Sequence, residues 1–137
     1  MLVNKKAIHI EWGDCDPLGI VYYPRYFEFF DACTDDLFEK AGLPMTKLLE
    51  TYGIAGIPMV ETRAVFTASS AFGDNVTIES CVARWGITSF SVEHKLFKDN
   101  ILAVECFEKR VWVVRSPDPA KRIVSRPIPK EVSDKFS

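Results

Sequence analysis

Residues 12–26 read WGDCDPLGIVYYPRY, and this stretch marks the point where the chain changes from the pattern of a strand to that of a helix. Before it, residues 6–12 alternate between apolar and polar side chains and predict a half-buried strand that ends with Trp12. After it, residues 25–41 place apolar side chains at every third or fourth position and predict an amphipathic helix about 25 Å long. The stretch between them therefore connects the two elements that define the fold.

This connection has the composition of a shaped loop. Gly13 and Gly19 allow backbone angles that other residues avoid, while Pro17 fixes its own. Pro24 suits the first turn of a helix, where the backbone N–H groups have no intrahelical acceptor. Those N–H groups can hold an anion, or an oxygen that becomes one during a reaction. A loop that brings a carboxylate beside them is an arrangement suited to catalysis.

The rest of the chain predicts an α+β fold in which a curved sheet wraps the long helix. Many aromatic side chains lie on that helix, so its surface needs a broad apolar partner. Turn-forming residues separate the later strands, which predicts an antiparallel meander. A short second helix is expected at 45–51, and strands are expected at about 57–69, 75–85, 88–98, 101–115 and 122–126.

The composition is that of one globular domain, residues 1–137. Of the 137 residues, 47% are apolar, which is enough for a core without disulfides or metals. The net charge is -2 and no basic run exceeds two residues, so the charge pattern of a nucleic-acid-binding protein is missing. There is no signal-peptide pattern and no run of about 20 apolar residues, so we expect no membrane span and a cytoplasmic location. Residues 116–137 are expected to form a terminal turn, the last short strand and a solvated tail.

Cysteine and histidine residues predict neither a metal site nor a nucleophilic thiol. The four cysteines form no C-x-x-C pair, and only two histidines are present, so no metal-ligand cluster is expected. Cys15 lies in the loop but has no histidine near it in sequence to act as a base. His94 belongs to an apolar alternation and is expected to pack in a strand, whereas His9 is expected to be exposed.

Residues 13–24 (GDCDPLGIVYYP), followed by Tyr26 and Asp31, resemble the signature of the 4-hydroxybenzoyl-CoA thioesterases, a family of the hotdog-fold superfamily. The likeness covers roughly residues 8–115 and continues, in order, through Gly42-Leu43-Pro44, residues 56–60 (GIPMV), residues 77–79 (TIE), Trp85 and Ser89-Phe90.

The resemblance implies a hotdog fold, that is, a curved antiparallel sheet of five to six strands around one long central helix. It implies hydrolysis of an acyl-CoA thioester, with no metal or other cofactor because CoA is part of the substrate. It also implies a homo-oligomer, a dimer of dimers (homotetramer), whose active sites are shared between subunits. Self-association also follows from the exposed sheet edge that such a fold leaves.

By this resemblance Asp16 is the catalytic carboxylate and Asp14 shapes the loop. On spacing alone, Asp16 is equally well explained as a residue that caps its own turn. An ionised Asp16 could attack the thioester carbon, or it could act as a general base on water; the sequence leaves both routes open. The family resemblance also makes the backbone N–H of Tyr23 the donor that stabilises the developing oxyanion.

The resemblance assigns the acyl pocket to Tyr22, Asp31, Gly19 and Ile57. Asp31 falls on the position where an acceptor distinguishes a hydroxylated ring from a bare one, which favours a hydroxyaryl acyl group. By periodicity alone Asp31 is also explained as part of a solvated acidic helix face. Tyr22 stands where well-matched family members carry Trp, so the pocket wall is altered there.

The CoA phosphates pose a separate question, because residues 86–88 (Gly-Ile-Thr) replace a basic run of the family pattern. The binding of the CoA phosphates must therefore be weaker or depend on other residues. The candidates are Ser89 and the basic residues Arg115, Lys121, Arg122 and Arg126.

The leading hypothesis is a thioesterase for an aromatic acyl-CoA such as 4-hydroxybenzoyl-CoA. A thioesterase for short-chain or other aryl acyl groups is the first alternative, and the changes at Tyr22 and residues 86–88 permit it. A hotdog hydratase is disfavoured because neither histidine stands in a matching motif. A non-catalytic acyl-CoA binding module is the alternative from another class, and the intact Asp16 loop argues against it.

Overall fold

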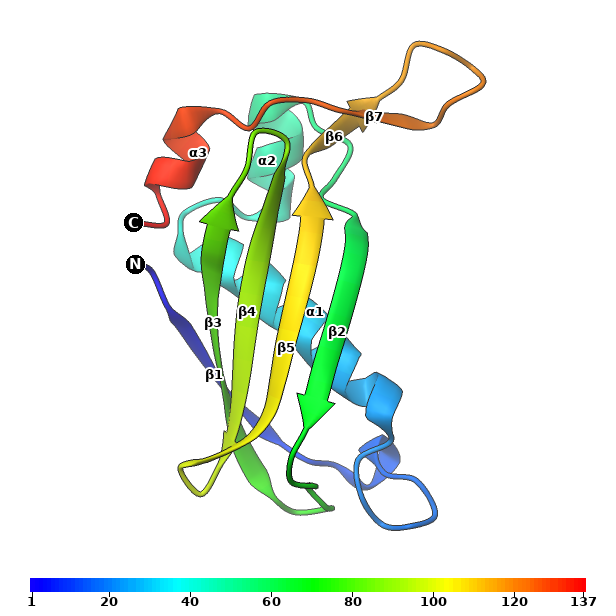
Figure 1. Ribbon diagram of the computed structural model, residues 1–137, viewed down its shortest axis with the longest axis vertical. Coiled ribbons are helices and arrows are strands. Elements are labelled where there is room, and N and C mark those ends of the chain that lie inside the picture. Colours follow the sequence, from blue (N-terminus) through cyan, green and yellow to red (C-terminus); the bar gives the residue numbers. More distant parts are fainter.

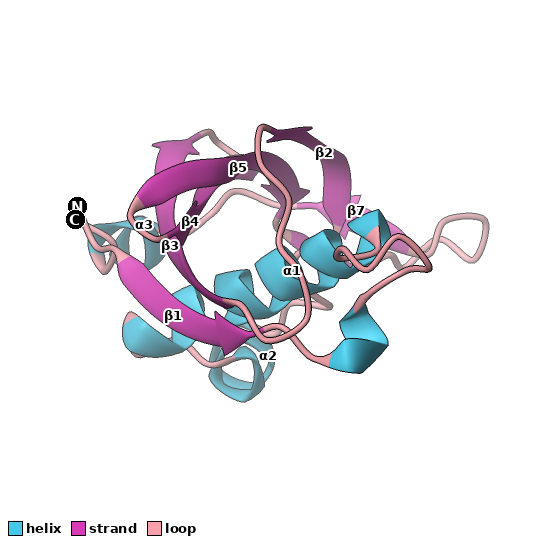
Figure 2. Ribbon diagram, turned by 90° about the horizontal axis from the view of Figure 1, so that it is seen from below, coloured by secondary structure: helices cyan, strands magenta, loops and turns pink.

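The computed structural model describes residues 1–137 and contains a five-stranded antiparallel sheet that curls around one long helix (Figures 1 and 2). The strand order along the sheet is β1-β3-β4-β5-β2. The bounds are β1 Asn4–His9, β2 Met59–Phe66, β3 Asn75–Trp85, β4 Ser89–Lys98 and β5 Ile101–Val111. The predicted α+β architecture, a curved sheet around a central helix, is confirmed.

The central helix α1 spans Tyr23–Lys40, close to the predicted 25–41. Its apolar stripe is buried because it faces the concave side of the sheet, and Pro24 occupies its first turn. The helix stops where Gly42 takes a φ of 81°, a conformation that glycine adopts without strain. The main buried residues of the stripe are Tyr26, Phe30, Cys33, Thr34, Leu37 and Phe38. The structure contains no helix with the length and apolar character needed to cross a membrane.

The first strand ends earlier than predicted, at His9, which is exposed as expected. Trp12 is not part of it: residues Trp12–Asp14 form a short 3-10 helix, and the Trp12 side chain is 72% exposed. The reason is local, because the carboxylate of Asp14 accepts the N–H of Glu11 at 2.9 Å and turns the chain away from the sheet. The strand predicted from the alternation of residues 6–12 therefore extends too far at its C-terminal end.

The predicted meander is correct only for β3, β4 and β5. Strand β2 pairs with β5 instead of β3, so it forms one edge of the sheet. The chain between β2 and β3 does not turn back as a hairpin, because it packs against the loop that precedes α1. There the N–H of Val21 donates to the carbonyl of Ser70 at 2.9 Å, and Ile20 pairs with Ala71. The turn signal at residues 72–75 belongs to this crossover.

The strand predicted at 101–115 divides into two. After Val111 the chain leaves the main sheet, and β6 (Val113–Arg115) pairs with β7 (Ile123–Ser125) as a separate small sheet. The second predicted short helix is present as α2, Met45–Tyr52, which buries Leu48.

The end of the chain is not the solvated tail that the sequence analysis expected. Residues Lys130–Asp134 form a helix, α3, that lies against the wide end of the sheet (Figure 1). Val132 and Phe136 are buried there. The Phe136 ring lies 4.8 Å from Phe38 and 5.2 Å from Trp85, measured between ring centroids. The segment therefore closes one end of the core around α1.

We predict that Phe136→Ala lowers the free energy of unfolding by about 3 to 5 kcal/mol, because it removes a buried ring and leaves a cavity. Lys135→Ala is the matched control, since Lys135 is exposed and adjacent in sequence, and its change is expected to stay within about 0.5 kcal/mol. Urea denaturation followed by fluorescence measures both. Equal stability of the two variants would show that the terminal segment is not part of the core.

Candidate active site

The loop between β1 and α1 is a tight hairpin that ends at the start of the helix. Cys15 and Val21 form an antiparallel bridge, and the N–H of Tyr22 donates to the carbonyl of Asp14 at 2.8 Å. These contacts hold the two ends of the loop together. Asp16, one residue beyond the bridge, is consequently fixed close to the beginning of α1.

Asp16 caps the turn at the tip of this hairpin with one of its two carboxylate oxygens. Its Oδ1 accepts the N–H of Leu18 at 2.8 Å, and its carbonyl accepts the N–H of Gly19 at 2.8 Å. Gly19 has a φ of 83°, so the turn requires a residue that tolerates the left-handed region. Oδ2 of Asp16 has no protein partner. The turn-cap interpretation is thus correct for Oδ1, and it leaves Oδ2 available for a reaction.

The backbone N–H of Tyr23 also has no acceptor in the protein. It is the first residue of α1, so no carbonyl precedes it at helical spacing, whereas its neighbours Val21, Tyr22 and Arg25 all donate. Tyr23 is also one of the residues around a hollow of about 230 Å³ with mostly apolar walls. The hollow is lined by Ile20, Val21, Tyr23, Tyr26, Phe66 and residues 67–69. Tyr22 is half exposed outside it and meets the Tyr23 ring edge-on, with centroids 5.8 Å apart.

A second hollow, of about 420 Å³, contains three of the predicted site residues. Asp31, Ile57 and Arg115 all line it, together with Asp35 and Arg110. Asp31 keeps 61% of its side chain exposed, yet its Oδ1 accepts a hydrogen bond from Nη2 of Arg110 at 2.7 Å. Asp31 is therefore not simply part of a solvated acidic face, because one of its oxygens is tied to the interior.

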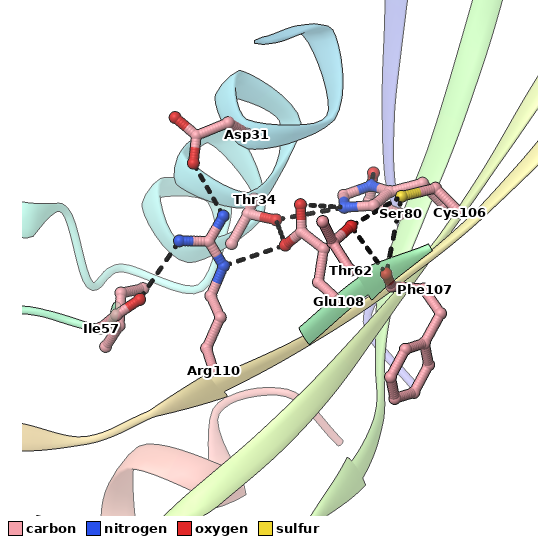
Figure 3. Close-up of polar contacts among 10 residues, drawn as sticks. Asp31, Thr34, Ile57, Thr62, Ser80, Cys106, Phe107, Glu108 and Arg110 are labelled. Atoms are coloured by element: carbon pink, nitrogen blue, oxygen red, sulfur yellow. Dashed lines mark hydrogen bonds and ion pairs between the residues drawn. The ribbon is translucent and has the colours of Figure 1, made fainter. Parts of the chain in front are cut away.

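Behind Asp31 runs a buried chain of charged groups that the sequence analysis missed (Figure 3). Nε of Arg110 donates to Oε1 of Glu108 at 2.9 Å, and Nη1 donates to the carbonyl of Ile57 at 3.2 Å. The side chains of Arg110 and Glu108 are only 7% and 1% exposed. A signal was present: Glu108 and Arg110 follow Cys106 at alternate positions of β5, which places two charges on its core-facing side.

The same carboxylate connects to His94 and Ser80. Thr34 donates its hydroxyl hydrogen to Oε1 of Glu108 at 2.7 Å, so the 3.2 Å contact between Thr34 and Nε2 of His94 requires Nε2 to carry the proton. Nδ1 of His94 then accepts from the hydroxyl of Ser80 at 2.7 Å. Although serine, histidine and glutamate lie in a row, Ser80 and His94 are each only 1% exposed, so the row is covered from solvent. The prediction that His94 packs in its strand is confirmed.

Comparison with known proteins places this geometry in a family. Residues 10–136 match the model of the thioesterase-like superfamily. The chain belongs to this superfamily. It is 34% identical over 120 residues to the 4-hydroxybenzoyl-CoA thioesterase of Pseudomonas sp. (strain CBS-3), an alignment that covers 83% of this chain and 85% of that relative.

Solved structures agree with the family assignment. The 4-hydroxybenzoyl-CoA thioesterase from Pseudomonas sp. strain CBS-3 superposes with a TM-score of 0.89 at 30% identity, covering 98% of this chain and 99% of that one. An aspartate-to-asparagine mutant of 4-hydroxybenzoyl CoA thioesterase, complexed with 4-hydroxybenzoyl CoA, gives 0.91 at 29% identity and covers all of both chains. A gentisyl-coenzyme A thioesterase gives 0.81 at 29% identity, with 97% and 98% covered. The protein is a thioester hydrolase, an acyl-CoA thioesterase of the 4-hydroxybenzoyl-CoA thioesterase type.

The predicted CoA-binding residues of this thioesterase do not gather in one place. Arg115 lies in the hollow with Asp31, whereas Lys121 and Arg122 are exposed in the loop between β6 and β7, which projects from the molecule (Figure 1). Ser89 lies on the face of the sheet opposite α1, in a hollow of about 290 Å³ that Arg84 also lines.

Burial also affects several other titratable groups of the thioesterase. All four cysteines are free thiols, and burial raises the pKa of Cys33 and Cys106 to about 11, which disfavours their thiolates. No group of three or more His, Cys, Asp or Glu side chains could hold a metal ion. Partial burial raises the pKa of Asp35, and the charge of the nearby Asp31 adds to that rise.

The Glu108 carboxyl stays ionised in the core because of its partners. Burial alone would raise its pKa, but the hydrogen bonds from His94 and Arg110 outweigh burial and hold the pKa below the ordinary value. For Arg110, burial acts to lower the pKa, while Glu108 and Asp31 outweigh it and raise the pKa. Each charge of the pair is therefore stabilised by the other.

We predict that Glu108→Gln lowers the free energy of unfolding at pH 7 by about 3 kcal/mol, because Arg110 loses one buried counter-charge. The folded-state pKa of Glu108 is lowered, so its stabilisation is complete above the unfolded pKa of about 4.3 and is lost as the pH falls through the folded value. The difference in the free energy of unfolding between wild type and variant should therefore become smaller as the pH falls below 5. Urea unfolding from pH 7 to pH 3 measures this difference. Glu39→Gln, at an exposed position without a partner, is the control, and a difference independent of pH would contradict the role given to Glu108.

Proposed function

We propose that this thioesterase hydrolyses an aromatic acyl-CoA of the 4-hydroxybenzoyl-CoA kind to the free acid and CoA. The observation that carries the proposal is that two groups of this loop have no partner in the protein: Oδ2 of Asp16, at the tip of the hairpin, and the N–H of Tyr23, where the loop enters α1. Asp31, with its own free Oδ2, supports a hydroxylated aromatic acyl group. The names of the similar proteins, which act on 4-hydroxybenzoyl-CoA and gentisyl-coenzyme A, support an aromatic acyl group as well.

Two routes fit an ionised Asp16. In one, a carboxylate oxygen bonds to the thioester carbon, the C–S bond breaks, CoA leaves as the thiol after protonation, and water opens the resulting anhydride. In the other, Asp16 takes a proton from water as the water attacks the same carbon; the C–S bond then breaks, and the proton goes to the departing sulfur of CoA. In both, the thioester oxygen becomes negative, and the free N–H of Tyr23 is the donor that stabilises it. Both routes as proposed use only the Asp16 carboxylate, the backbone N–H of Tyr23 and water.

The contact with the CoA phosphates is best supported at the hollow around Ser89. Arg84 and Lys109 line it and neither forms an ion pair within the protein, so both cations are available for phosphate oxygens. The hydroxyls of Ser89 and Ser91 add two donors to the same hollow. Arg115, Lys121, Arg122 and Arg126 do not line this hollow and are the weaker candidates.

We predict that wild type releases CoA from 4-hydroxybenzoyl-CoA faster than from benzoyl-, phenylacetyl-, acetyl- or hexanoyl-CoA. Asp16→Asn should lower kcat by about 10² to 10⁴-fold, because the amide can neither attack nor accept a proton. Asparagine still has an oxygen for the N–H of Leu18, so the turn is kept. Thiol release, detected with a chromogenic disulfide, measures both enzymes.

Asp118→Asn is a matched control for this substitution. Oδ1 of Asp118 accepts the N–H of Ala120 at 2.9 Å, the same turn cap that Asp16 forms with Leu18, but in the loop between β6 and β7. Its kcat should stay within about twofold of wild type, as for a surface substitution. Full activity of Asp16→Asn would remove Asp16 from the mechanism, and a preference for acetyl- or hexanoyl-CoA would replace the aromatic substrate by a short-chain one.

We further propose that the enzyme is a homo-oligomer, a dimer of dimers, in which the β2 edges of two copies meet. Strand β2 has a neighbour on one side only, so the other side presents unpaired backbone groups. Four large apolar side chains on it are exposed, namely Met59, Val60, Val65 and Phe66. An edge that is both unpaired and apolar is the kind of surface that a second copy covers by two-fold symmetry.

We predict that wild type sediments at a multiple of the single-chain mass in analytical ultracentrifugation. Val60→Asp combined with Val65→Asp should shift it to a smaller species and lower its activity, because charges would be buried between the two edges. Ile101→Asp is the control, since Ile101 is a highly exposed apolar residue at the start of β5, outside the pairs that β5 forms with β2. A wild type that sediments at the mass of one chain excludes the proposed assembly.

We place the enzyme in the cytoplasm. Its four cysteines are unpaired, and Cys15 and Cys81 are only partly covered. Exposed free thiols persist in a reducing compartment, whereas secreted proteins of this size use cysteines as disulfides.

A further inference from the structure

The buried chain of charges behind Asp31 ends at a single open group. Glu108 and Arg110 are almost wholly inaccessible, while Asp31 is exposed in the 420 Å³ hollow. Only Oδ1 of Asp31 contacts Arg110, at 2.7 Å, and Oδ2 has no protein partner. The buried chain of charges therefore leaves one hydrogen-bond acceptor, Oδ2 of Asp31, available to a ligand in the hollow.

Arg110 cannot turn, because three of its nitrogens are fixed. Nε donates to Glu108 at 2.9 Å, Nη1 to the carbonyl of Ile57 at 3.2 Å, and Nη2 to Asp31 (Figure 3). Glu108 in turn accepts from Thr34, which lies on α1 one helical turn beyond Asp31. The Arg110 guanidinium thus connects α1, β5 and the segment around Ile57. Because the guanidinium is planar and fixed at three nitrogens, it also fixes the orientation of the Asp31 carboxylate.

Stability alone gives a weak reason for this arrangement. The desolvation of two buried charges consumes most of their attraction, and well-packed apolar residues in their place are often equally stable. A chain of charges that begins in the core and emerges at one free carboxylate oxygen is instead suited to orienting that oxygen.

We propose that Arg110, held by Glu108, is a positioning residue that aims Oδ2 of Asp31 at a hydroxyl group of the bound acyl moiety and so sets the preference for hydroxylated over unsubstituted aryl thioesters. The inference rests on the proposed function, because it requires an aromatic acyl group to enter this hollow. The hydroxyl donates its hydrogen to Oδ2. An unsubstituted ring would cover the same carboxylate without pairing it, and sites built for a hydroxyl reject the analogue that lacks it for this reason.

The test compares variants that separate positioning from folding. Arg110→Met alone would leave Glu108 charged and unpaired in the core, so the double variant Glu108→Met with Arg110→Met is used, which removes both charges together. Arg110→Lys is the second variant: it keeps the charge, but a single ammonium cannot hold Glu108 and Asp31 in the geometry of the fork. Asp31→Ala, alone and added to the double variant, completes the cycle.

Lys6→Met is the matched control. Lys6 also donates to an aspartate of α1, Asp36, at the same 2.7 Å, but it does so from β1 on another side of the helix. Thermal unfolding of every variant, followed by circular dichroism, establishes that each one is folded.

Two ratios are measured for 4-hydroxybenzoyl-CoA against benzoyl-CoA. One is the ratio of kcat/KM, and the other is the ratio of the association constants (1/Kd) in the Asp16→Asn background, where turnover does not interfere. The double variant should lower both ratios at least about tenfold, as Asp31→Ala does, with no further loss when the two are combined. Arg110→Lys should give an intermediate loss, and Lys6→Met should leave both ratios unchanged.

The outcomes separate this inference from the proposed function. If Asp31→Ala lowers the ratios but the double variant and Arg110→Lys do not, Arg110 does not position Asp31 and the inference is wrong. It is equally wrong if wild type does not prefer the hydroxylated thioester in either ratio. If no aryl-CoA is hydrolysed but the Kd ratio responds as expected, the positioning role stands and the hydrolytic proposal fails.

Discussion

Burial of the α1 stripe inside the curved sheet is the constraint on which the other features depend. Phe30, Leu37 and their neighbours on the helix can leave water only if β1, β3, β4 and β5 bend around them. Once the helix axis is fixed in this way, its first residue and its exposed side are fixed as well. The free N–H of Tyr23 and the carboxylate of Asp31 both belong to α1, so the core determines where the two groups lie.

The buried polar groups of Glu108, Arg110 and His94 interrupt this core, and their burial costs desolvation free energy. Their position in the core explains how that cost is limited. Phe30 stacks on the His94 ring with centroids 5.1 Å apart, so an apolar face of the imidazole completes the packing around α1. Every polar atom of Glu108 and His94 has a partner, and Ser70 holds the one buried side-chain oxygen without one. A fully satisfied network is tolerated in a core where a partly satisfied one is not.

The sequence predicted those features that depend on local pattern. The period of residues 25–41 marked α1 to within two residues, and the glycine and proline positions marked the Asp16 hairpin. The sequence did not predict features that depend on contacts between distant parts of the chain. Strand β2 pairs with β5, and Phe136 packs in the core beside Phe38. Glu108 and Arg110 were passed over because charges in a strand are usually solvated. Only the structure brings Arg110 next to Asp31, 79 residues away in sequence.

The two hollows lie toward opposite ends of the same open edge, and this bears on the proposed assembly. Phe66, at one end of β2, lines the hollow beside Tyr23, while Ile57, just before the other end, lines the hollow of Asp31. Along α1, eight residues separate Tyr23 from Asp31, which is about 12 Å of helix. A two-fold axis through the middle of β2 reverses the strand, so it would set the proposed oxyanion donor of one copy, the N–H of Tyr23, beside the proposed hydroxyl acceptor of its partner. In that arrangement one subunit would contact the thioester carbonyl and the other would contact the far end of the acyl ring. The distance between these two contacts across the interface would then determine which ring length fits.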